Sequence, residues 1–215
     1  MGISSRCRRM VEKIIPDIIV GRLPRYLRTL QEMRDNGATT TSSQELGERL
    51  GISAAQIRKD LSQFGEFGKQ GTGYSIDYLI EKLQNILKVD RMWDMVLVGI
   101  GDLGHAIARY GGFTNCGFQI TKVFDNDPTK VGKTVAGFTV QSMDEMEAEI
   151  QNNHIQIAMI TTPASAAQGV ADCLVKAGVK AILNYAPTTL AVPREVHVQY
   201  IDPVVHLQRM TYYLV

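Results

Sequence analysis

Cysteine is scarce in this sequence of 215 residues, and its three copies form no recognisable pattern. Cys7, Cys116 and Cys173 are odd in number, widely separated and without a C-x-x-C pair, which excludes a disulfide framework and a cysteine zinc site. Long hydrophobic runs are also lacking, since stretches such as IQIAMI and MVLVGI fall far short of the roughly 20 apolar residues that span a bilayer. Charges and a proline interrupt the apolar stretch at the N-terminus, so no secretory signal is predicted. We therefore expect no membrane association and a cytoplasmic location.

The sequence also lacks a pattern for catalysis or metal binding. Its histidines have no metal-ligand spacing, and none pairs with a carboxylate and an arginine in one motif, as a hydride-transfer enzyme would need. The four histidines are His105, His154, His197 and His206. No catalytic and no metal-ligating residue is predicted, and each histidine is interpreted as a surface or packing residue.

Charge is nearly balanced over the whole chain, which carries a formal net charge of +1. Along the chain it is uneven: residues 1–90 hold 14 lysines and arginines against 11 aspartates and glutamates, whereas residues 91–215 are slightly acidic. This change of sign is compatible with a nucleic-acid-binding first half but is too small to establish one. The length and the ordinary globular composition favour two domains.

A pair of short helices around a tight turn is predicted in the first half of the chain. Ser42 followed by Glu45 is a capping box that opens the first helix, and Ser53 followed by Gln56 opens the second. Gly51 supplies the turn between them. The apolar residues that would share one small core are Leu46, Leu50, Ile52, Ile57 and Leu61. The pattern predicts a helix-turn-helix.

The second of these helices has a polar face opposite its apolar one. At about 100° per residue, Ile57, Leu61 and Phe64 fall on one side. The residues that fall toward the other side are small or basic: Ala55, Arg58, Lys59 and Ser62. A recognition helix needs such a face, because basic side chains reach guanine edges and phosphates while small ones let the helix enter the major groove. A solvated charged face is the alternative interpretation.

Glycine is dense just after this helix, in the stretch GEFGKQGTGYS. The glycines around Lys69 predict a hairpin of tight turns whose backbone can approach another surface closely. Beside a helix-turn-helix, such a hairpin is a wing. It would lay Lys69 and the backbone at Gly71 and Gly73 along phosphates or in the minor groove. A plain glycine-rich linker is the alternative.

The second half opens with a glycine motif, VLVGIGDLGHAIARY, which follows a predicted buried strand and begins a predicted helix. Gly99 permits the tight turn, Gly101 lets the backbone approach a pyrophosphate, and Gly104 lets helix and strand pack closely. The helix N-terminus, with the amides around Asp102 and Leu103, would bind the diphosphate. The carboxylate of Asp102 opposes that binding, so the amide dipoles must outweigh it.

An acidic residue follows this motif at the distance that a dinucleotide site requires. The strand QITKVFDND brings Asp125 to a position 21 residues after Gly104, where the ribose-binding carboxylate is expected. An acid there accepts a hydrogen bond from the ribose 2′-hydroxyl and repels a 2′-phosphate. The strand, the glycine motif and the acid together predict NAD(H) rather than NADP(H) as the ligand.

Further strands and helices alternate toward the C-terminus. IQIAMITTP and KAILNYAP read as buried strands, with a helix between them. The alternation predicts an α/β Rossmann domain, a doubly wound and mostly parallel sheet whose strand ends line the cofactor crevice. Candidates for the nicotinamide half are Thr162, Asn184, Tyr185 and Pro187, and Thr161 at the end of the first of these strands is a further cofactor-binding candidate.

The chain ends in an apolar helix that is too short for a substrate domain but suits a dimer contact. Together with amphipathic helices over 23–33 and 76–89, it completes the expected organisation. The four parts are a winged-helix DNA-binding domain (1–76), a linking helix (77–90), a Rossmann NAD(H)-binding domain (91–200) and a C-terminal helix (201–215).

Two alternatives stay open at this point. One is a small NAD-dependent oxidoreductase whose N-terminal helices merely cap the sheet, although the missing catalytic pair speaks against it. The other is a nucleotide-binding module for coenzyme A, since similar sheets with glycine turns bind that ligand. Asp125 speaks against the second, because it suits a free ribose 2′-hydroxyl and offers no positive partner for a 3′-phosphate.

The order of these parts resembles the Rex family of redox-sensing transcriptional repressors. The resemblance spans nearly the whole chain and depends on the segments RLPRYLRTL, ATTTSSQELGERLGISAAQIRKDLSQFGEFGKQGTGY, LVGIGDLGHAIARY, VFDNDPTKVG and AILNYAP. It implies a homodimer that exchanges its terminal helices and binds palindromic operator DNA when NADH is scarce. NADH and NAD+ would compete for one crevice as regulatory ligands. It also implies DNA contacts from Arg58, Lys59 and the wing from Lys69 to Tyr74.

The resemblance further implies a redox switch of three residues. Members of the family join an arginine of the first helix, a tyrosine after the glycine motif and an aspartate before the terminal helix. Here the matching residues are Arg28, Tyr110 and Asp202. Some members place an aromatic residue after that aspartate to reach the partner's nicotinamide, whereas this chain has Pro203.

Overall fold

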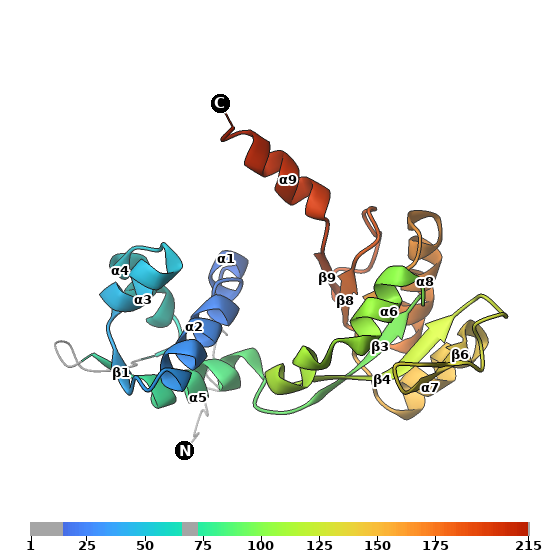
Figure 1. Cartoon of the computed structure of the whole chain (residues 1–215), viewed down its shortest axis with the longest axis horizontal. Coiled ribbons are helices and arrows are strands. Elements are labelled where there is room, and N and C mark those ends of the chain that lie inside the picture. Colours follow the sequence, from blue (N-terminus) through green and yellow to red (C-terminus); the bar gives the residue numbers. More distant parts are fainter. Residues whose placement is uncertain (1–14, 66–72, 215) are drawn as a thin grey trace, which may run out of the picture. The chain divides into compact units, whose positions relative to one another are not determined.

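The computed structural model describes residues 15–65 and 73–214, and the chain divides into two compact units (Figure 1). Unit 1 runs from Met1 to Asp90 and unit 2 from Arg91 to Val215. The helices and strands of unit 1 are α1 (Asp17–Val20), α2 (Leu23–Asp35), β1 (Thr40–Thr41), α3 (Ser43–Leu50), α4 (Ala54–Leu61), β2 (Tyr74–Ser75) and α5 (Ile76–Leu87).

The helix-turn-helix of unit 1 forms where its capping residues predict it. The Glu45 amide donates to Ser42 Oγ at 3.1 Å and opens α3, and the Gln56 amide donates to Ser53 Oγ at 3.2 Å and opens α4. Gly51 ends α3 in the left-handed region, with φ of +67°. The prediction of two capped helices around a glycine turn is therefore confirmed.

One hydrophobic core holds unit 1 together. It joins the apolar faces of α2, α3, α4 and α5, with Leu23, Leu46, Ile57 and Leu79 fully buried. Helix α5 packs against α2 and contributes four buried residues, so it belongs to this core. The strand pair β1 and β2 is antiparallel and places Thr41 opposite Tyr74.

Unit 2 is an α/β structure. Its elements are β3 (Trp93–Val98), α6 (Asp102–Arg109), η1 (Gly111–Cys116), β4 (Phe118–Asp125), β5 (Thr134–Val135), β6 (Phe138–Ser142), η2 (Met143–Glu145), α7 (Met146–Asn152), β7 (Ile157–Ile160), α8 (Ala164–Ala177), β8 (Ala181–Asn184), β9 (His197–Tyr200) and α9 (Pro203–Thr211).

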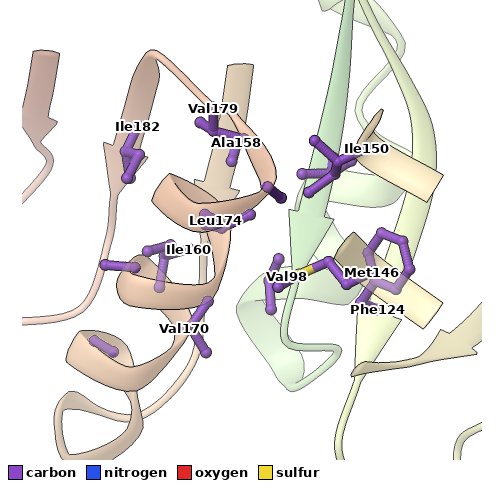
Figure 2. Packing of buried hydrophobic residues seen from close by; sticks show 14 of the residues in the cluster. Val98, Phe124, Met146, Ile150, Ala158, Ile160, Val170, Leu174, Val179 and Ile182 are labelled. Atoms are coloured by element: carbon purple, nitrogen blue, oxygen red, sulfur yellow. The ribbon is translucent and has the colours of Figure 1, made fainter. Parts of the chain in front are cut away.

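These strands form one seven-stranded sheet in the order β5-β6-β4-β3-β7-β8-β9. All neighbours are parallel except β5 and β6. Alternate side chains of β3 enter different cores: Val96 and Val98 pack with α7 and α8, whereas Met95 and Leu97 pack with α6. Figure 2 shows the first of these cores, where Val98 of β3 lies beside Met146 of α7. The sheet is thus covered on both faces, as the predicted doubly wound fold requires.

Helix α9 differs from the rest of unit 2 because all of its residues are exposed. Its large apolar side chains include Val205, Leu207 and Met210, each more than half exposed. A continuous apolar face of this kind marks an interaction surface. No helix in the described part of the chain is long and apolar enough to cross a membrane.

Candidate functional site

The glycine motif forms a tight loop between β3 and α6. Gly99 has φ of +97°, a conformation that side chains disfavour, and its position leaves no room for a Cβ beside Thr162. A Cβ on Gly104 would collide with the carbonyl oxygen of Gly99. The Gly101 side of the loop is open. The loop therefore closes tightly on the sheet and leaves its backbone accessible at Gly101.

A cavity of about 680 Å³ lies at this loop, at the carboxyl ends of β3, β4 and β7. Such a position, outside the carboxyl ends of parallel strands, is the usual ligand site of a doubly wound sheet. The sequence-predicted residues that line it are Gly99, Gly101, Asp102, Leu103, Asp125, Thr161 and Thr162. Asn126, Asp127, Lys130 and Ser165 also line it and were not predicted.

Two helix N-termini face the cavity. Helix α6 begins at Asp102, and the first intrahelical bond of its backbone runs from the His105 amide to the Gly101 carbonyl. The amides of Asp102 and Leu103 precede that bond and so keep their donors for a ligand. Helix α8 begins beside Ser165, which lines the same cavity. Both ends favour an anion such as a diphosphate.

Asp125 is buried beneath the loop. The Ile100 amide donates to its Oδ2 at 2.6 Å, the Asp127 amide donates to Oδ1 at 2.8 Å, and Lys130 Nζ lies 3.2 Å from Oδ2. Burial raises the pKa of the Asp125 carboxyl, but these hydrogen bonds outweigh it and hold the pKa below its ordinary value. The carboxylate therefore anchors the glycine loop to the end of β4.

The two threonines after β7 have different partners. Thr161 Oγ1 lies 2.7 Å from the Gly99 carbonyl oxygen and 3.0 Å from that of Val98, so its hydroxyl donates to the loop. Thr162 Oγ1 is buried and has no hydrogen-bond partner within the described residues. A buried hydroxyl without a partner is costly, and a ligand in the cavity could satisfy it.

Asn184 and Tyr185 lie outside the set of cavity-lining residues. The fully buried Asn184 uses its amide for a local turn: Nδ2 donates to the carbonyls of Ala186 and Thr188, and Oδ1 accepts from the Ala186 amide. Tyr185 packs on the core that contains α6, and burial raises the pKa of its phenol. The structure thus gives Asn184 a structural role at the end of β8.

The predicted DNA-contacting face of α4 is open to solvent. Ala55, Arg58, Lys59 and Ser62 are all exposed. Arg58 Nη1 donates to Ser43 Oγ at 2.9 Å, which ties the guanidinium to α3. Lys59 has no such contact among the side-chain bonds of the described residues, so its amine is available to a phosphate.

The predicted wing lies only partly within the described residues. Lys69 and Gly71 are outside them. Gly73 has φ of +75°, and a Cβ there would stand 2.7 Å from the Thr41 carbonyl oxygen, so the chain needs glycine where it joins β2. Tyr74 follows directly as the first residue of β2.

The buried side of α4 carries a polar cluster that sequence reasoning missed. Asp60 is completely buried, and Arg22 donates to both of its carboxylate oxygens at 2.6 and 2.8 Å. The Tyr26 hydroxyl donates at 2.6 Å and Gln56 Nε2 at 2.7 Å. The signal was present, because helical periodicity places Asp60 on the same side as Ile57.

Ionisation of this cluster follows from its contacts. Burial raises the pKa of the Asp60 carboxyl, but the hydrogen bonds from Arg22, Tyr26 and Gln56 together bring it below its ordinary value. Burial and the neighbouring carboxylate raise the pKa of Tyr26 to about 12. Asp60 is therefore charged and Tyr26 neutral at physiological pH, which fixes α4 on α2.

Each of the three predicted switch residues has a local partner. Arg28 Nε donates to Glu32 at 3.2 Å on the exposed face of α2. The Tyr110 ring packs edge-on against Phe113, with 4.9 Å between ring centroids. Asp202 caps α9 by accepting from the Val204 amide at 2.9 Å. The switch itself stays a prediction.

Family models match both units of the chain. The model described as "CoA binding domain" matches residues 90–188, and the model described as "Putative DNA-binding protein N-terminus" matches residues 14–62. The second match contains the whole helix-turn-helix, and the first contains the glycine loop and the cavity.

Curated relatives cover nearly the whole chain. The redox-sensing transcriptional repressor Rex of Roseiflexus sp. (strain RS-1) is 52% identical over 93% of this chain and 90% of its own length. The repressor of the same name from Brevibacillus brevis is 48% identical over 93% of this chain and 97% of its own.

Solved structures agree with these relatives. The crystal structure of RSP in complex with β-NAD+ and operator DNA shares 38% of its sequence with this chain, with a TM-score of 0.89 over 94% of each chain. RSP in complex with β-NADH shares 36%, with a TM-score of 0.85 over 94% of this chain and 95% of its own. RSP is described as a Rex-family repressor. With identities near 50% over more than nine tenths of its length, this chain belongs to the Rex family of redox-sensing transcriptional repressors.

Proposed function

We propose that this chain represses transcription by binding operator DNA through unit 1, and that NADH in the cavity of unit 2 releases it. The observation that supports this best is the presence of both sites in one chain: an exposed basic face on α4 and a large cavity at a glycine loop. A relative with 94% mutual coverage, RSP, is known in complex with β-NAD+ and operator DNA together.

DNA recognition is assigned to α4. Its small residue Ala55 lets the helix approach the major groove, while Arg58 and Lys59 supply donors for guanine edges and phosphates. The wing around Lys69 and Tyr74 follows the adjacent backbone or minor groove. Two copies of the chain, joined through α9, read the two halves of a palindromic operator.

Nucleotide sensing is assigned to the cavity. The amides at Asp102 and Leu103 bind the pyrophosphate, and Thr162 supplies a hydroxyl on the side of the nicotinamide. NADH and NAD+ share their phosphates and differ at the ring by one hydride and one positive charge, so a sensor must respond to the ring. A preference of about 100-fold for one dimer shape would shift the equilibrium by about 2.7 kcal/mol.

The redox switch is part of the same proposal. Asp202 pairs with Arg28 in one state and with Tyr110 in the other, and the reduced or oxidised ring decides which pair forms. The local contacts of Arg28 with Glu32 and of Tyr110 with Phe113 are weak, exposed ones that such a rearrangement can replace.

The family assignment removes the oxidoreductase alternative, because the relatives are repressors and not enzymes. Because the matching family model is described as a CoA binding domain, the identity of the nucleotide is argued from the residues of the cavity. The cavity lining holds three aspartates and one lysine, which favours a ligand without a phosphomonoester on its ribose. As a DNA-binding repressor, the chain acts in the cytoplasm.

The proposal is tested by measuring operator binding at different ratios of NADH to NAD+. Fluorescence anisotropy with a labelled palindromic operator library, at fixed salt, would be titrated with NADH and NAD+ separately. We expect NADH to release the DNA at much lower concentration than NAD+. Equal operator affinity at every ratio of the two nucleotides would contradict the proposal.

A further inference from the structure

We propose that Asn36 is a site of chemical modification, where deamidation turns the side-chain amide into a carboxylate whenever the end of α2 opens. Asn36 and Gly37 form the only Asn-Gly pair of the sequence. Glycine is the most permissive residue after an asparagine for this reaction, because it has no Cβ to hinder its own backbone nitrogen. The inference is independent of the proposed nucleotide site and of operator binding.

The reaction needs only water as a second reactant. The backbone nitrogen of Gly37 loses its proton and attacks Cγ of Asn36. A new C–N bond closes a five-membered succinimide, the bond from Cγ to Nδ2 breaks, and the proton leaves with the departing ammonia. Water then opens the ring at one of its two carbonyls. One opening gives aspartate, and the other gives isoaspartate, whose main chain runs through the former side chain.

Solvent reaches both reacting groups in the folded chain. Asn36 and Gly37 are exposed, and the space where Gly37 would carry a Cβ is open. Burial therefore does not protect this pair from water or base. Any protection has to come from the geometry of the turn.

Hydrogen bonds hold the two reacting groups apart. Asn36 Nδ2 donates to the Glu32 carbonyl at 2.7 Å, and the Gly37 amide donates to the Arg34 carbonyl at 2.8 Å. Asn36 has ψ of 10°, which points the Gly37 nitrogen away from the Asn36 Cβ, whereas ring closure needs the two to be eclipsed. The reaction must break both bonds and rotate the main chain, so it proceeds through local opening of the last turn of α2.

The product cannot restore this end of the helix. Gly37 has φ of +86°, and the Ala38 amide donates to the Met33 carbonyl at 3.0 Å, which completes a Schellman motif. An aspartate has no Nδ2 to donate to Glu32, and it adds a negative charge beside Asp35, where the helix dipole disfavours an anion. An isoaspartate also lengthens the main chain inside the motif. Deamidation therefore loosens the end of α2 next to the buried Met33.

Unit 2 contains a matched internal control. Asn153 ends α7 as Asn36 ends α2: it is exposed, and its Nδ2 donates to the Glu149 carbonyl at 2.7 Å. The next two amides bond back to α7 in the same pattern. The residue after Asn153 is His154, which adopts the left-handed conformation with φ of +52°. The two caps match and the following residue differs, so the pair separates the effect of the cap from that of the glycine.

Peptide mass spectrometry of the purified full chain tests the site. The chain is kept at neutral pH, folded or in denaturing urea, and the conversion of each asparagine to aspartate and isoaspartate is followed over time. In urea we expect Asn36 to react well before Asn153, and His154→Gly should bring Asn153 to the rate of Asn36. In the folded chain Asn36 should react at least about tenfold more slowly than in urea, the effect of the two hydrogen bonds that must break.

The variant Asn36→Asp imitates one product and tests the consequence. It should lower the melting temperature of unit 1 by several degrees, whereas the fluorescence of Trp93 should show unit 2 unchanged. A wild-type melting temperature in this variant would overturn the predicted loosening of α2. Equal rates at Asn36 in the folded and the unfolded chain would overturn the protection by the cap. If Asn36 does not react ahead of Asn153 in urea, the site itself is wrong.

Discussion

Each unit of this chain buries one aspartate beneath the element that we propose binds its ligand, but the two carboxylates accept hydrogen bonds from different donors. Asp60, under α4, accepts from side chains: the guanidinium of Arg22, the hydroxyl of Tyr26 and the amide of Gln56. Asp125, under the glycine loop, accepts mainly from the main-chain amides of Ile100 and Asp127, with the side chain of Lys130 as its third donor.

The difference follows from what each aspartate has to hold. A helix satisfies its own backbone, so α4 can be fixed to α2 only through side chains. A glycine loop has open amides, so a single carboxylate can tie its backbone directly to the end of the next strand. The proposed DNA-binding element is therefore a rigid helix docked by an ion pair, and the proposed nucleotide-binding element is a loop whose backbone is held by a carboxylate.

The glycines of the two units repeat this contrast. Gly47 in α3 lies where a Cβ would collide with the carbonyl oxygen of Ile52, in the turn before α4. Gly104 in α6 lies where a Cβ would collide with the carbonyl oxygen of Gly99, in the loop itself. In both units a glycine within a helix permits the close approach of a carbonyl oxygen from the neighbouring turn or loop.

The largest effect is expected from removing the buried carboxylate of unit 1. Asp60→Ala leaves Arg22 and Tyr26 without their shared partner, which should destabilise unit 1 by about 3–5 kcal/mol and abolish operator binding. Urea denaturation followed by circular dichroism measures the loss. Trp93, the only tryptophan of the chain, lies in unit 2 and reports that unit separately.

The control for this variant is Asp35→Ala, because Asp35 is an exposed carboxylate on α2. It should leave both stability and operator binding near the wild-type values. If Asp60→Ala weakens NADH binding as much as it weakens DNA binding, the two units are not separately anchored and the comparison fails.

A matched pair of glycine variants should have the next largest effect. Gly47→Ala and Gly104→Ala each add one methyl group against a backbone oxygen, at a cost of about 1–3 kcal/mol in their own unit. We expect Gly47→Ala to reduce operator binding while NADH still binds. We expect Gly104→Ala to reduce NADH binding while operator binding persists and no longer responds to NADH. Anisotropy and nucleotide fluorescence on both variants measure the two losses, and identical profiles for the two variants would contradict the comparison.

Acid should weaken both units by a smaller amount, because a protonated carboxyl still fills its place. The folded-state pKa values of Asp60 and Asp125 both lie below the ordinary value of 3.8. A lowered folded pKa contributes stability that is present above the unfolded pKa and is lost as the pH falls through the folded one. Unfolding free energies measured from pH 6 down to pH 2 should therefore decline below about pH 4 in both units. In Asp60→Ala the unfolding free energy of unit 1 should fall less with decreasing pH than in the wild type, whereas that of unit 2 should fall as in the wild type. A wild-type pH dependence of unit 1 in this variant would contradict the role assigned to Asp60.

The smallest effect is expected at the exposed face of α4. Lys59→Ala removes one cation from the surface without disturbing the Asp60 cluster. If Lys59 contacts a phosphate, operator affinity falls alike for all sequences and the slope of log affinity against log salt shrinks by about 1. If it reads a base, specificity relaxes at one position instead. Lys176→Ala, which removes an exposed lysine of α8 in unit 2, is the control, and an unchanged salt slope and specificity in Lys59→Ala would remove this lysine from the interface.

Local signals account for most of what the sequence predicted correctly. Ser42 and Ser53 cap their helices within three residues, and the turn at Gly51 needs no distant partner. The glycine loop is likewise encoded in a short segment, so the fold class and the position of the cavity followed from it.

Long-range pairing explains what the sequence did not disclose. Arg22 pairs with Asp60 across 38 positions of the sequence. Helical periodicity places Asp60 on the buried side of α4 but does not identify Arg22 as its partner. Asp125 stands at the expected distance from the glycine motif, yet only the coordinates reveal that its oxygens are taken by Ile100 and Asp127. Asn184 was predicted from its place at a strand end, and only the coordinates reveal that its amide closes a local turn.

The central claim is that nucleotide in unit 2 and operator DNA on unit 1 bias one equilibrium, and reciprocity tests it most directly. Binding free energies that are coupled must be coupled equally in both directions. NADH affinity would be measured with and without saturating operator, and operator affinity with and without saturating NADH, at one salt concentration. We predict that operator lowers NADH affinity by the same factor by which NADH lowers operator affinity. An NADH affinity that the operator leaves unchanged would contradict the account.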